Sequence, residues 1–87
     1  MSNSNEKLPL KSFNIVVNGN QKTVYDHVLS FIQVVALADG LPTGPNVTYT
    51  VAYRKSDQAK KEGTLGEGES VKIKNGTVFD VTATDKS

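Results

Sequence analysis

The sequence predicts an α+β fold in which a mixed β-sheet packs on one helix. Residues 13–17 alternate as a strand does, and Asn18-Gly19 then turns the chain into a second strand at residues 21–25. A helical block follows at residues 30–38, and strand patterns return at residues 47–54, 70–74 and 77–83. Two strands, one helix and further strands, in this order, are typical of the β-grasp fold.

The helix has signals at both of its ends. Ser30 suits the N-cap, because its hydroxyl can accept a hydrogen bond from a free amide of the first turn, although Asp26 competes for that role. Gly40 suits the left-handed position that follows a last helical turn. Between these ends, apolar residues recur at helical spacing and form one stripe, made of Phe31, Val34, Val35 and Ala38.

The second half of the chain supplies the remaining strands. Residues 47–54 alternate apolar with mostly polar side chains, which is the clearest strand pattern in the chain. We expect Leu65 to anchor an otherwise irregular segment, and residues 74–77 to form a second hairpin turn. The predicted core comprises Phe13, Ile15, Val17, Phe31, Val34, Val35, Tyr49, Val51, Leu65, Val71, Ile73, Phe79 and Val81.

The composition limits the classes of function. A chain of 87 residues has room for one domain. Ten Lys and Arg against nine Asp and Glu leave a net charge of +1, so we expect no nucleic-acid partner. There is no cysteine, which excludes disulfides, thiolate catalysis and the usual structural zinc sites.

The chain divides into a leader and one domain. Residues 1–11 are polar, and we expect them to form a flexible leader. Residues 12–87 form the predicted domain, with a very short C-terminal overhang. The longest apolar stretch, residues 34–38, is too short to span a bilayer, and the first residues lack the apolar core of a signal peptide. We therefore expect a cytoplasmic protein with no membrane partner.

Three features suggest chemistry but have simpler explanations. His27 follows Asp26 without a nucleophile or a metal-ligand cluster, which favours a surface residue or a local cap. Residues 66–68 (GEG) resemble a phosphate-binding loop, but their carboxylate would repel an anion and a strand follows, so we expect a tight turn. A loose basic cluster, formed by Lys55, Lys60 and Lys61, is a solvated loop or an acceptor for a modifier. The sequence predicts no enzyme and no cofactor.

The sheet face that points away from the helix is a candidate partner surface. It is small and mildly apolar, which suits transient binding, although the outer face of any small sheet has this character. Tyr25 and Tyr53 are candidate contact residues, with partial burial as the commoner fate of such tyrosines. The residues predicted to line the face are Val16, Thr48, Thr50, Ala52, Val78, Thr82 and Thr84.

Several segments together resemble the bacterial multiubiquitin-type domain. The similarity covers residues 12–87 and is carried by FNIVVNG at 13–19, VALA at 35–38, YTVAY at 49–53, KEGTL at 61–65 and GESVKIK at 68–74. The ending FDVTATDKS, at residues 79–87, is especially close.

This resemblance implies a ubiquitin-like β-grasp module without catalytic residues. Domains of this family are encoded beside an E1-like activating enzyme, an E2-like conjugating enzyme and a processing peptidase, which the resemblance implies as partners. It implies a protein modifier of a bacterial ubiquitination-like pathway linked to defence against phage. Many relatives join several such domains, whereas this sequence holds one.

The last residues differ from those of ubiquitin, which presents Gly-Gly to its activating enzyme. Activation threads a C-terminal carboxylate into an adenylating site, and diglycine fits its narrow channel. Here we expect Thr84 and Asp85 to emerge almost directly from the last strand. We hypothesise that a peptidase removes Lys86 and Ser87, so that Asp85 becomes the conjugating terminus. The alternatives are that Ser87 is the reactive end or that the domain is never conjugated.

The sequence supports three functional hypotheses. The first is a conjugated modifier with one reactive terminus. The second is a non-covalent binding or adaptor module that docks on a partner enzyme through the open sheet face. The third and weakest is a sulfur carrier or a small enzyme. A sulfur carrier needs a glycine tail and an enzyme needs a group of polar residues in a pocket, and the sequence shows neither.

Overall fold

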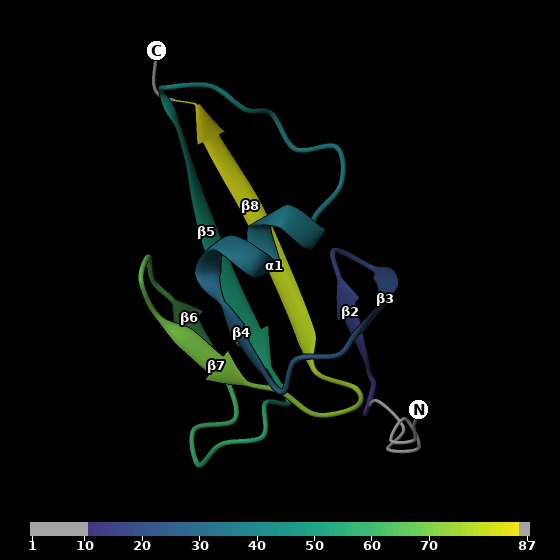
Figure 1. The fold of residues 1–87 in the computed structure, drawn as a ribbon. Helices are drawn as coiled ribbons and strands as arrows, with labels where there is room; N and C mark the ends of the chain where they lie inside the picture. The colour runs from purple at the N-terminus through teal and green to yellow at the C-terminus, as the bar shows by residue number, and fades with distance from the viewer. Residues whose placement is uncertain (1–10, 86–87) are drawn as a thin grey trace, which may run out of the picture.

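The computed structural model describes residues 11–85, and these form the mixed sheet and single helix that the sequence predicts. The larger sheet has five strands in the order β3-β2-β8-β5-β6, and α1 (Phe31–Leu37) lies against β5 and β8 (Figure 1). Its strands are β2 (Phe13–Val17), β3 (Asn20–Val24), β5 (Val47–Arg54), β6 (Gly63–Leu65) and β8 (Val78–Asp85). A second, two-stranded sheet pairs β4 (Val28–Ser30) with β7 (Ser70–Lys72).

The last strand lies in the middle of the larger sheet. β8 runs parallel to β2, with Val16 opposite Val78 and Val17 opposite Phe79. On its other side β8 is antiparallel to β5 along the whole strand, from Arg54 opposite Val78 to Val47 opposite Asp85. Two parallel neighbouring strands, here β2 and β8, that share a sheet and are separated in sequence by a helix are typical of the β-grasp arrangement.

The core lies between the inner face of the larger sheet, α1 and the small sheet. Alternation along β2, β5 and β8 places every second side chain in this layer. Most of the predicted core is buried, but Val35 and Tyr49 are only partly buried at its edge. Leu29 and Tyr53, which were not predicted as core, are buried. Leu65 is buried as the predicted anchor of its segment.

Two local predictions are wrong, and one strand was not predicted. Residues 63–65 are not irregular, because β6 pairs with β5 at Val51, Ala52 and Tyr53. Residues 28–30 form the unpredicted strand, β4, directly before the helix. Residues 74–77 turn the chain but form no hairpin, since β7 pairs with β4 while β8 enters the larger sheet.

The helix begins as its sequence signals predict. Ser30 is the N-cap, and its hydroxyl accepts a hydrogen bond from the Gln33 amide at 3.3 Å, while the Gln33 side chain accepts one from the Ser30 amide at 2.9 Å. Asp26 instead accepts a hydrogen bond from the Gln33 side-chain amide at 3.3 Å. Gly40 has the predicted left-handed conformation, with φ of 78°.

Candidate functional site

The predicted partner surface is assembled by strand register. Thr48 lies opposite Thr84 and Thr50 opposite Thr82 on neighbouring strands, and Val16 lies beside Val78. Their side chains share the outer face because residues two apart in a strand point to the same side. Thr48, Thr50, Thr82 and Thr84 are exposed, while Val16, Ala52 and Val78 are half-buried.

The chemistry of this outer face is that of a contact surface. Threonine contributes a methyl group and a hydroxyl, and none of the four exposed threonines lines the groove beside α1 or the cleft at Lys61 and Lys74. At one end, Arg54 pairs with Asp80 at 2.8 Å across β5 and β8, and both side chains are about half exposed. Such a face can bind a protein through buried contact area and hydrogen bonds.

The C-terminal half of β8 has one open edge. β2 pairs with β8 only at Val78 and Phe79, and strand pairing on that side stops there. The Asn18 side chain continues the contact, because it donates to the Val81 carbonyl at 3.0 Å and accepts from the Val81 amide at 2.7 Å. Beyond Val81, backbone groups of Ala83 and Asp85 point to this edge, and no strand among residues 11–85 pairs with them there.

The predicted conjugation residues lie at the tip of this strand. β8 continues two residues beyond its predicted end, because β5 begins early enough to pair with Thr84 and Asp85. Both residues are exposed. Figure 1 shows this tip at the opposite end of the molecule from the start of β2. Lys86, the third predicted residue, lies outside the described residues.

The two candidate contact tyrosines have opposite environments. Tyr25 follows β3 and is 60% exposed, at the rim of an apolar groove between β3 and α1, whereas Tyr53 is buried on the inner face. Of these two, Tyr25 alone is available to a partner. The sequence pattern could have separated them, because Tyr53 shares its strand face with Val51.

His27 is at the surface, as predicted, and its contacts are structural. Its ring stacks on Phe13 with the centroids 5.1 Å apart, and its Nε2 lies 3.1 Å from the Asp57 carboxylate. Its carbonyl accepts from the Ile73 amide at 2.9 Å, which joins two loops. Residues 66–69 form the predicted tight turn, in which the Glu69 amide donates to the Gly66 carbonyl at 3.0 Å.

Neither a metal-ligand cluster nor a membrane-crossing helix is found among residues 11–85. This range holds no group of three or more His, Asp and Glu side chains placed to bind a metal ion. It also contains no helix with the length and apolar character needed to cross a membrane.

Comparison with known proteins gives one match. The model of the family described as Multiubiquitin matches residues 13–85, which is nearly the whole described range. No curated protein and no solved structure matches the chain significantly.

Proposed function

The chain belongs to the multiubiquitin family, and from this premise we propose that it is a ubiquitin-like protein modifier of a bacterial ubiquitination-like pathway. The pathway we propose is cytoplasmic and serves defence against phage. An E1-like enzyme would activate the domain, an E2-like enzyme would transfer it, and a peptidase would first remove the residues beyond Asp85.

The observation that carries this proposal is the position of the end of β8. Thr84 and Asp85 are exposed at the tip of a strand that is anchored at its other end in the middle of the sheet. Only β5 pairs with them among the described strands, so releasing them from the sheet breaks few contacts. An extended backbone with one open edge is also the form in which peptidases commonly hold a substrate strand.

The first test is reconstitution with the peptidase, the E1-like enzyme, the E2-like enzyme and ATP. We expect mass spectrometry to show loss of Lys86 and Ser87, and gels to show ATP-dependent bands of higher mass. Asp85→Arg should abolish these bands, because a long charged side chain at the reactive end obstructs a narrow channel. Glu67→Arg, which makes the same charge change at an exposed loop residue, should leave them intact. An uncleaved chain, a cut elsewhere or bands that persist in Asp85→Arg would contradict the assignment.

The second candidate function is a non-covalent docking module, and the threonine-rich outer face favours it. In that case the domain would form a complex with the activating enzyme without higher-mass bands. Thr50→Arg, in the middle of this face, should weaken the complex by about tenfold or more, measured by biolayer interferometry. Thr43→Arg, the same substitution at an exposed residue of the loop after α1, is the matched control and should bind as wild type does. Equal losses in both variants would exclude the outer face as the docking site.

A further inference from the structure

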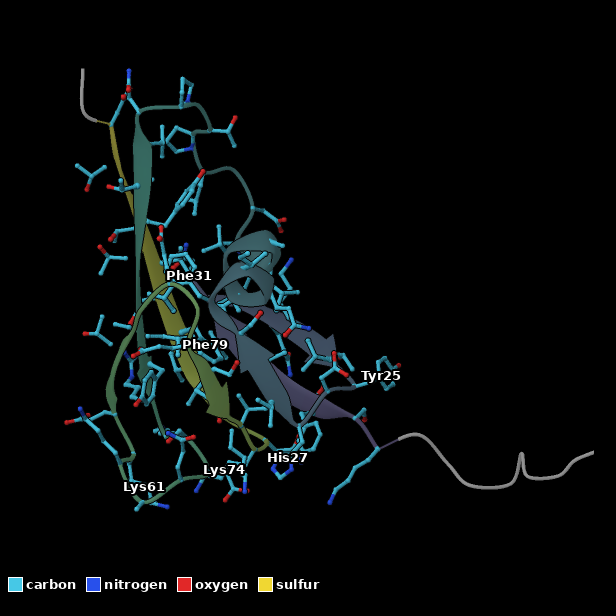
Figure 2. All side chains as sticks on the ribbon, turned by 60° about the vertical axis from the view of Figure 1, so that its left-hand side comes forward. Tyr25, His27, Phe31, Lys61, Lys74 and Phe79 are labelled. Carbon is cyan, nitrogen blue, oxygen red and sulfur yellow. The ribbon has the colours of Figure 1, made fainter. Side chains whose placement is uncertain are left out.

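A basic cleft opens at the end of the molecule where β5 ends and β8 begins. Its volume is about 620 Å³, and its charged lining residues are Arg54, Lys55, Lys61, Glu62 and Lys74. Figure 2 shows Lys61 and Lys74 at this same end, on two different loops. Four cations and one carboxylate give the lining a net charge of +3, whereas the whole chain has +1. The positive charge of this protein is therefore concentrated at the cleft.

Two buried hydroxyl groups hold the backbone that carries these lysines. Ser56 is 0% exposed, and its Oγ donates to the Lys60 carbonyl at 2.8 Å while its amide donates to the Lys61 carbonyl at 3.0 Å. Thr77 is also 0% exposed, and its Oγ1 donates to the Lys55 carbonyl at 2.7 Å and accepts from the Lys74 amide at 3.0 Å. The backbone beneath the lysine side chains is thus preorganised, a property that lowers the entropic cost of binding.

The backbone of Lys55 has an unusual conformation. Its φ is 61°, in the left-handed region that residues other than glycine seldom adopt. The Thr77 hydrogen bond to its carbonyl holds it there, at the mouth of the cleft. Backbone strain of this kind is concentrated at functional sites in proteins.

Three of the four cations are available to a ligand. Arg54 is paired with Asp80, whereas Lys55, Lys61 and Lys74 form no ion pair with any residue in the range 11–85. Each lysine carries a compact charge on its own flexible side chain. Three lysines therefore suit several carboxylates on different side chains better than they suit one planar anion.

We propose that this cleft binds an acidic peptide segment of a partner protein, with two or three neighbouring carboxylates. Three lysines without an ion pair among residues 11–85, together with the net charge of the lining, match such a segment. A nucleic acid would instead need a long basic face, and the net charge of +1 provides none. The inference goes beyond the proposed function, because the cleft meets the outer face only at Arg54, and its lining includes none of the exposed threonines of that face and no residue at the end of β8.

The test uses labelled hexaglutamate and fluorescence anisotropy at about 20 mM and about 150 mM salt. We expect saturable binding that weakens as salt rises. Lys61→Gln combined with Lys74→Gln should weaken it about tenfold, since each exposed charge pair contributes modestly. Lys11→Gln combined with Lys22→Gln removes the same charge outside the cleft and should bind as wild type does. In the unmodified protein, amide chemical shifts of Lys55, Lys61 and Lys74 should move on titration.

Four results would overturn the proposal. One is the absence of saturable hexaglutamate binding at low salt, and another is an equal loss of binding in the two double variants. A third is tighter binding of inorganic pyrophosphate or of a single-stranded oligonucleotide of equal charge. The fourth is a set of shifted amides that maps away from the cleft.

Because all four substituted lysines lie outside the core, circular dichroism should show native folding in both double variants.

Discussion

Replacing Phe79 with alanine is expected to remove a large fraction of the domain's free energy of unfolding. Phe79 is 0% exposed on the central strand, with Val17 and Tyr53 as its neighbours on the two flanking strands. Figure 2 shows Phe79 and Phe31 in the region between the sheet and α1. Truncating a fully buried phenylalanine costs about 3–5 kcal/mol, because transfer free energy is lost and a cavity remains. A domain of this size has only about 5–15 kcal/mol of stability, so this loss is a large fraction of it.

The measurement is urea denaturation followed by far-ultraviolet circular dichroism, since the chain has no tryptophan to report on unfolding. Tyr25→Ala is the matched control: it removes an aromatic side chain that is 60% exposed, and its effect should stay within about 0.5 kcal/mol. If Phe79→Ala were as mild as Tyr25→Ala, the centre of the core would lie elsewhere. Where Phe79→Ala does unfold the domain, any loss of conjugation in that variant follows from unfolding.

Long periodic segments made much of this fold predictable from sequence. β2 and β5 begin and end at the predicted residues, because their alternation is regular over five and eight positions. The helix was predictable because its cap and its apolar stripe agree.

Short strands held mainly by backbone pairing could not be predicted in the same way. β4 and β6 have three residues each, which is too short for a period to be visible. β6 contains only one buried apolar side chain, Leu65, and its pairing with β5 uses backbone groups that every sequence has. The turn at residues 74–77 shows a related limit, since turn-forming residues predict a change of direction and not the partner of the next strand.

The candidate surfaces also divide into features that the sequence predicts and features that it does not. The outer threonine face was predictable, because side-chain alternation fixes the face once the strands are known. The open edge beyond Val81 and the buried Thr77 depend on residues distant in sequence, whereas the buried Ser56 bonds the nearby Lys60 and Lys61 carbonyls. Ser56 and Thr77 are polar residues, a class that is mostly exposed, so the sequence favours exposure for both. Their burial is explained by the hydrogen bonds that their side chains make in the folded chain.

The second large effect is expected at Asn18, whose side chain bonds both backbone groups of Val81. Asn18 has φ of 51°, so alanine there would lose two hydrogen bonds and would also adopt a left-handed conformation that it disfavours. Each hydrogen bond contributes about 1 kcal/mol, and the conformation costs about 1 kcal/mol more. We therefore expect Asn18→Ala to lower the free energy of unfolding by about 2–3 kcal/mol, measured by urea denaturation.

Two further substitutions separate these contributions. Asn18→Gly loses the hydrogen bonds but tolerates the backbone, so its loss should be about 1 kcal/mol smaller than that of Asn18→Ala. Asn18→Asp keeps the acceptor for the Val81 amide, at 2.7 Å in the native protein, and should retain slow hydrogen exchange at that amide. Alanine and glycine variants should both exchange it faster. If Val81 stayed protected in both, the Asn18 side chain would not be what closes this edge of β8, and the free edge would begin at a different residue.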